Sequence, residues 1–174
     1  MNDLIVTFDS LYQSFRDFEK TLDKIIFARI HLREDDQQIK RFNELLQDLQ
    51  NITSRIQKDV NAIEKILRVS RSWKEEAIEE ANLSLSDLFT TYEIVIARYK
   101  SYVDKFGCQS SLENSLKLCT SCMDQLDQLL YTFNSKNNLK LLIPSEESEI
   151  VKTIMSNGYK VVTERDWSKL VVYR

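Results

Sequence analysis

The stretch that decides the fold runs from Ile39 to Leu67 and reads IKRFNELLQDLQNITSRIQKDVNAIEKIL. Its apolar residues recur at alternating spacings of three and four, which aligns their side chains along one stripe of an α-helix. Acidic residues 34–36 precede it, and negative charge suits a helix N-terminus. The pattern therefore predicts one helix about 50 Å long. Its stripe is Ile39, Phe42, Leu46, Leu49, Thr53, Ile56, Val60, Ile63 and Leu67, with Thr53 as the one polar member.

Three further segments show the same spacing and predict helices over about residues 3–30, 73–106 and 110–135. The first stripe is Leu4, Phe8, Leu11, Phe15, Phe18, Leu22 and Ile25. The next is Ile78, Ala81, Leu85, Leu88, Tyr92, Val95, Tyr99, Tyr102 and Phe106. The last is Leu112, Leu116, Cys119, Met123, Leu126, Leu130 and Phe133.

Local signals separate these segments from one another. Ser72 with Glu75, and Ser110 with Glu113, have the spacing of capping boxes, which satisfy free backbone N–H groups at a helix start. Gly107 supplies a C-terminal stop. These signals favour a hairpin of separate helices over one continuous rod from residue 35 to 106, which would be about 100 Å long.

The residues after the fourth stripe follow a different pattern. A short apolar run, Leu139 to Ile143, ends at Pro144, and residues 145–157 predict a short helix. Residues 159–162 and 167–173 are β-prone around a polar turn, so they predict a small hairpin or a segment that orders on a partner. We therefore expect an all-α fold. An elongated antiparallel bundle of about four helices occupies residues 1–135, and a C-terminal appendage of a short helix and a β-hairpin occupies residues 136–174.

Composition narrows the class of protein. The chain has 174 residues, of which 43% are hydrophobic, with two glycines and one proline, so long elements and few turns are expected. The formal net charge is −3 without a basic face, which does not favour nucleic acid as a partner. No stretch has the roughly 18 apolar residues of a membrane span. Three cysteines argue against a disulfide framework and favour the cytoplasm or nucleus.

Catalytic chemistry finds little support in the sequence. His31 is the only histidine, and two glycines do not suffice for a phosphate-binding loop. We expect no enzyme activity, no cofactor and no metal site. Cys119 and Cys122 form a C-x-x-C motif, but in mid-helix and on the apolar stripe, so we interpret them as buried, unreactive thiols. A redox role is the alternative.

Aromatic residues are the candidates for partner binding. Tyrosine carries a polar tip and is enriched at interfaces, and the first stripe is bulky for a helix packed on one neighbour. The alternative is that these side chains fill the protein's own core. The candidates are Phe8, Tyr12, Phe15, Phe18, Tyr92, Tyr99 and Tyr102.

Two segments carry a resemblance to a known family. Residues 44–49 and 82–89, followed by Tyr92 and Glu93, resemble the last two helices of GAT domains, which are three-helix bundles of endosomal and Golgi sorting adaptors. The resemblance implies a cytosolic module that binds ubiquitin or an adaptor near Asn82, Leu85 and Leu88. Leu83 stands where that family has an aspartate.

The C-terminal residues from Ile150 to Val161 are loosely similar to the ends of fungal inner-kinetochore coiled-coil subunits. Together these features favour a non-enzymatic helical scaffold or adaptor subunit of a larger eukaryotic complex. Its partners would be other helical or coiled-coil chains, or a second copy of this chain. A ubiquitin-binding trafficking module and a chromosome-segregation subunit are the alternatives.

Overall fold

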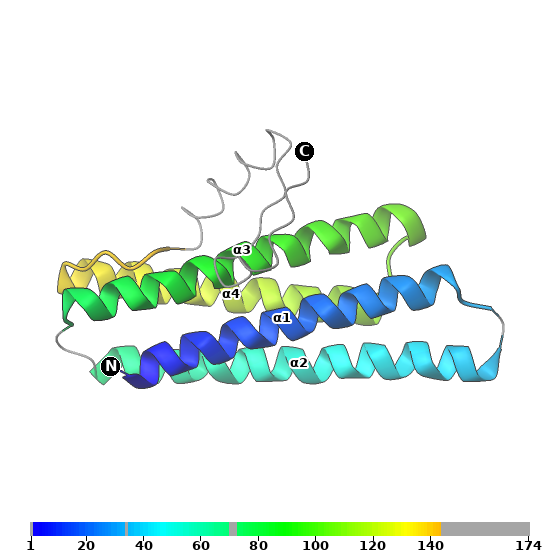
Figure 1. Cartoon of the computed structure of the whole chain (residues 1–174), viewed down its shortest axis with the longest axis horizontal. Helices are drawn as coiled ribbons and strands as arrows, with labels where there is room; N and C mark the ends of the chain where they lie inside the picture. Colours follow the sequence, from blue (N-terminus) through cyan, green and yellow to red (C-terminus); the bar gives the residue numbers. More distant parts are fainter. Residues whose placement is uncertain (1, 34, 70–72, 144–174) are drawn as a thin grey trace.

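A computed structural model describes residues 2–33, 35–69 and 73–143, and these residues form an all-α bundle (Figure 1). The helices are α1 (Asn2–Ile30), α2 (Asp36–Val69), α3 (Glu75–Phe106) and α4 (Ser110–Asn137). No strand occurs in the described part of the chain. The predicted short helix and β-hairpin fall within residues 144–174, outside the described residues.

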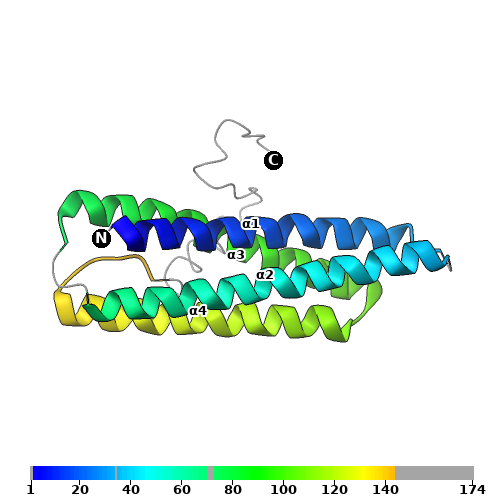
Figure 2. The same cartoon turned by 90° about the horizontal axis from the view of Figure 1, so that it is seen from below.

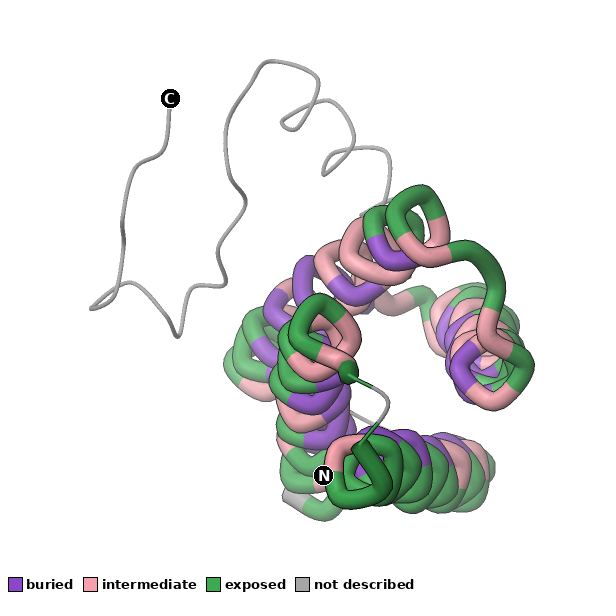
Figure 3. Tube along the Cα trace, turned by 90° about the vertical axis from the view of Figure 1, so that its right-hand side faces the viewer, coloured by how far each residue is buried: buried purple, intermediate pink, exposed green. Residues whose placement is uncertain are grey.

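The apolar stripes form the core of the bundle. Every member of the α1 stripe is fully buried, and the α2 stripe is buried from Phe42 to Leu67. Ile39, at the start of α2, is the exception and is 42% exposed. Figure 3 shows the buried positions of all four helices facing one another across the bundle.

The helices are neighbours in the order α3, α1, α2, α4 around the bundle (Figures 2 and 3). α1 packs against α2 and α3, and α2 also packs against α4. Sequential helices run in opposite directions, but α1 and α3 run the same way, as do α2 and α4. The expectation of an antiparallel bundle therefore holds for helices joined by a loop and is wrong for these two side-by-side pairs.

The helix boundaries correct the predicted capping boxes. α3 begins at Glu75, two residues after Trp73, and α4 begins at Ser110 itself, with Lys74 and Gln109 as N-caps. Neither N-cap makes a side-chain hydrogen bond. The predicted capping box with Ser110 as N-cap is thus wrong by one residue, although the predicted break between the third and fourth helices is confirmed. Gly107 ends α3 with φ 81°, a conformation that glycine tolerates best.

The bundle extends beyond the predicted boundary at residue 135. α4 continues to Asn137, and Asn138 ends it in the left-handed conformation with φ 52°. The chain then turns back, and Leu141 and Ile143 are buried against the bundle. α2 and α3 are separate, as predicted, but they do not pack on each other as a hairpin, because they occupy opposite corners.

Candidate interaction surfaces

Most of the aromatic candidates lie inside the bundle. Phe8, Phe15 and Phe18 are fully buried, and Tyr12 and Tyr102 are nearly so. The bulk of the α1 stripe has a simple explanation, since α1 contacts two neighbouring helices rather than one. In this conformation these residues form the protein's own core, so a surface for a partner must come from other residues.

Two tyrosines of α3 lie between the core and the surface. The Tyr92 ring packs edge-on against Phe15 with ring centroids 5.8 Å apart, and burial raises the pKa of its hydroxyl although that group hydrogen-bonds Thr120. Tyr99 is also half-buried, and burial raises its pKa with a smaller contribution from Glu113. Tyr92 hydrogen-bonds Thr120 of α4 and Tyr99 interacts with the charge of Glu113 of α4. The two tyrosines therefore connect α3 with α4, which do not pack closely along their backbones.

The residues that carry the GAT resemblance are not gathered on a surface. Leu85 and Leu88 are fully buried in α3. The Asn82 side chain is engaged, because its amide donates to the Lys140 carbonyl oxygen at 3.0 Å and accepts from the Leu142 N–H at 2.9 Å. The segment around residues 140–142 thus lies against Asn82 in this fold.

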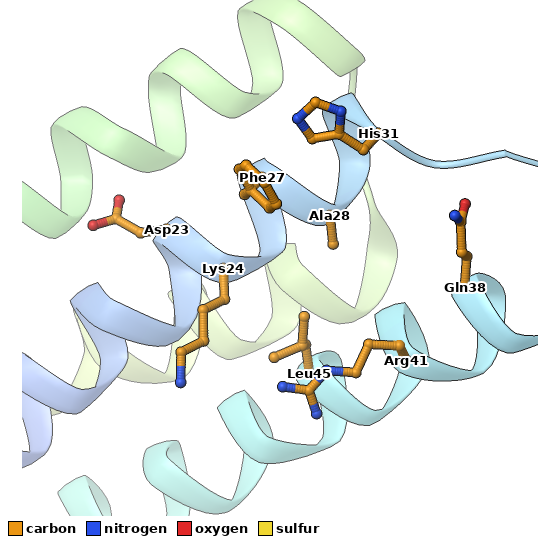
Figure 4. A pocket seen from close by; sticks show the side chains of 8 residues that line it. All are labelled: Asp23, Lys24, Phe27, Ala28, His31, Gln38, Arg41 and Leu45. Carbon is orange, nitrogen blue, oxygen red and sulfur yellow. The ribbon is translucent and has the colours of Figure 1, made fainter.

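An open groove between α1 and α2 was not predicted from the sequence. It has a volume of about 710 Å³ and lies at the end of the bundle where the α1–α2 loop is found (Figure 4). We call it the α1–α2 groove. It is lined by Asp23, Lys24, Phe27, Ala28 and His31 of the first chain segment and by Gln38, Arg41 and Leu45 of α2.

The α1–α2 groove combines an apolar floor with a charged rim. Phe27, Ala28 and Leu45 supply the floor, and the Phe27 side chain is 66% exposed although it packs on the His31 ring with centroids 4.5 Å apart. Lys24 and Arg41 extend from opposite helices into the space between them (Figure 4). The sequence signal was present, since Phe27 falls outside the α1 stripe, where an aromatic side chain gains nothing from the core.

A second hollow adjoins the groove at Lys24. It has a volume of about 360 Å³, also lies between α1 and α2, and has a polar lining that includes Lys20, Asp48 and Arg55. Asp17 accepts a hydrogen bond from Arg55 at 2.7 Å. Burial alone would raise the pKa of Asp17, but the hydrogen bonds from Arg55 and Gln13 outweigh it and hold the pKa below its usual value.

Ion pairs fix α1 against its neighbours beside this surface. Arg98 of α3 binds the carboxylates of both Glu19 and Asp23, with a nitrogen–oxygen distance of 3.2 Å to Glu19. On the α2 side of α1, Asp17 is paired with Arg55 at 2.7 Å. Because these contacts hold α1 from both sides, the groove is a preformed feature of the bundle.

A third hollow, of about 490 Å³, lies between α2 and α4 around Leu67, Leu129 and Phe133. The buried thiols of Cys119 and Cys122 also lie between these two helices, against Thr53 and Gln57 of α2. Among the described residues, no group of three or more histidine, cysteine, aspartate or glutamate side chains is arranged to hold a metal ion. No helix in that part of the chain is long and apolar enough to cross a membrane.

The geometry therefore offers surfaces for binding, among them the α1–α2 groove. Comparison of the chain with protein-family models, with curated proteins and with solved structures gives no match.

Proposed function

We propose that this chain is a non-enzymatic helical adaptor or scaffold subunit that binds another protein through the α1–α2 groove. The observation that carries the proposal is the exposure of Phe27 on the floor of a preformed, largely apolar groove. Burying a phenylalanine side chain contributes roughly 1.5–3 kcal/mol, which this protein does not gain by itself.

Neighbouring residues extend the apolar surface at this end of the bundle. Ile30 and Ile39 flank the α1–α2 loop and are 48% and 42% exposed. Clustered exposed apolar side chains rimmed by polar groups are typical of protein-binding sites. The three cysteines are free thiols, which supports a reducing compartment such as the cytoplasm or nucleus.

The proposal is tested by affinity purification of the full chain from the cells that express it, followed by quantitative mass spectrometry. Phe27→Ser is compared with Tyr131→Ser, because Tyr131 of α4 is exposed to a similar extent, 61%, and lies outside the groove. We expect a defined set of proteins to be lost with Phe27→Ser and retained with Tyr131→Ser. Circular dichroism checks that both variants keep the helical fold. Equal retention by the two variants would argue against this surface.

A further inference from the structure

The charges around the α1–α2 groove are unevenly compensated. Of the acidic residues that line it and the adjoining hollow, Asp17 is bound by Arg55 and Asp23 by Arg98. Asp48 is the one lining carboxylate without an ion pair to the described residues. Lys24 has no such pair either, Lys20 acts on Asp17 through its charge without a direct ion pair, and Arg41 has only an exposed contact to Glu44 at 3.7 Å. The lining carries four basic side chains (Lys20, Lys24, Arg41 and Arg55) against three acidic ones, an excess of one positive charge on a chain whose formal net charge is −3.

The shape of the surface suits a helix. The groove and the hollow share Lys24 and together follow α1 from Asp17 to His31, a length of about 20 Å or four helical turns. Two antiparallel helices form both walls, which is the geometry that receives the apolar stripe of a third helix. An extended peptide would need a free strand edge to pair with, and the walls here are helices whose backbone groups are bonded within each helix.

We infer that the α1–α2 groove binds an acidic amphipathic helix of a different protein. Its apolar stripe would cover Phe27, Ala28 and Leu45, and its carboxylates would face Lys20, Lys24 and Arg41. This inference rests on the proposed function and specifies the chemistry of the partner.

The first acidic residues after Ile143 are too few residues along the chain to reach Phe27. Ile143 lies on the α3–α4 side, near Asn82, and Glu149 is six residues further on, at most about 20 Å. Asp9 of α1 lies level with Ser84 of α3, since their side chains are hydrogen-bonded at 2.8 Å. Phe27 is a further 18 residues along α1, about 27 Å along the axis alone. Beyond Glu149 basic residues outnumber acidic ones, so charge complementarity points to a different chain.

The test uses the full chain and two fluorescent helical peptides of about four to five turns. Both carry leucine at helical spacings, one with glutamates and the other with lysines at the flanking positions. Binding is measured by fluorescence anisotropy at low and high salt. The variants are Lys24→Glu and Lys20→Glu. The matched control is Lys100→Glu, an exposed lysine of α3 that does not line the groove.

We expect the acidic peptide to bind more tightly than the basic one, with an affinity that falls as salt screens the charges. Lys24→Glu should weaken it by about tenfold, while Lys100→Glu changes it by less than about twofold. Three results would overturn the inference. They are equal binding of the two peptides, no binding of the acidic peptide, and equal effects of Lys24→Glu and Lys100→Glu on its affinity. The inference would also be overturned if sedimentation showed that the full chain is a dimer and that Lys24→Glu dissociates it. The occupant of the groove would then be a second copy of this chain.

Failure here is distinguishable from failure of the proposed function. Suppose that Phe27→Ser loses its set of captured proteins while the acidic peptide does not bind. The α1–α2 groove then binds a protein, as proposed, but that partner is not an acidic amphipathic helix.

Discussion

The two buried thiols are the residues whose chemistry depends most on their surroundings. Cys119 is fully buried on the core side of α4, and burial raises its pKa to about 12, with a smaller contribution from Cys122. Cys122 is also buried, and its Sγ donates to the Gln57 side-chain oxygen at 3.2 Å. Thiolates are the reactive form of cysteine, so the C-x-x-C motif lies where its thiols stay protonated. The predicted burial of this motif is confirmed.

The raised pKa of Cys119 makes stability depend on pH in the alkaline range. In the unfolded chain the thiol loses its proton near pH 9, whereas in the folded protein it retains the proton up to about pH 12. The folded state then binds more protons, so the contribution is fully present below about pH 9 and is lost as the pH rises toward 12.

Between pH 9 and 10 this group should lower the free energy of unfolding by about 1 kcal/mol. Urea denaturation across this range measures the loss. Cys119→Ala should be less stable at neutral pH, because it leaves a small cavity, and should show a shallower decline above pH 9. An unchanged slope in that variant would assign the pH dependence to other groups, such as Tyr92 and Tyr102, whose pKa values burial also raises.

Among the structural elements, the returning segment 139–143 closes the bundle where α3 and α4 lie apart. Asn82 of α3 pairs with the backbone of Lys140 and Leu142, and Asn134 of α4 pairs with both backbone groups of Leu141. An asparagine amide both donates and accepts, so it satisfies an extended backbone that has no strand partner. Leu141 is 3% exposed and Ile143 is 8% exposed, so the segment contributes to the core.

Asn82→Ala should release this segment from α3. Two hydrogen bonds to the backbone are removed, of which the one to Leu142 is partly buried and the one to Lys140 is exposed, so we expect the free energy of unfolding to fall by about 1–2 kcal/mol. Amide hydrogen exchange at Leu142 should accelerate. The control is Asn114→Ala, at an exposed position in α4, where the higher helix propensity of alanine acts without these contacts. Equal stability changes with unaltered exchange at Leu142 would contradict the role of Asn82.

How much of these elements the sequence predicts depends on the range of the interactions involved. The stripes from Leu4 to Ile25 and from Phe42 to Leu67 are periodic, so local spacing identified both the helices and their buried faces. The predicted ends of the helices were less accurate. For example, Gln109 rather than Ser110 is the N-cap of α4. Asn82 and Asn134 carry no local pattern for their role, since that role depends on a segment that turns back after α4. The α1–α2 groove likewise arises from two helices together, and Phe27 was its only sequence signal.

At the scale of the whole molecule, the arrangement of the helices depends on which helices bury apolar side chains against more than one neighbour. α1 is buried against both α2 and α3, so it occupies a corner where its large aromatic stripe meets two neighbours. α2 is shared in the same way between α1 and α4. The chain therefore forms two hairpins laid side by side, in which α1 lies beside α3 and α2 beside α4. Heptad stripes specify a buried face but not its neighbour, which is why the sequence did not predict these parallel pairs.

This order of helices predicts a specific cross-link between α2 and α4. Gln57 is in contact with Cys122, so Gln57→Cys places a thiol beside a native one, whereas Lys58→Cys places it one residue further on, at an exposed position. Under mild oxidation, with Cys108 changed to serine because it is exposed, we expect an intramolecular disulfide in Gln57→Cys and none in Lys58→Cys. Non-reducing electrophoresis and peptide mass spectrometry identify the bond. A bundle in which α2 and α4 occupied diagonal corners would keep the two thiols far beyond the Cα separation of about 4.4–6.8 Å that a disulfide requires, so formation of this cross-link in the folded protein would exclude that diagonal arrangement.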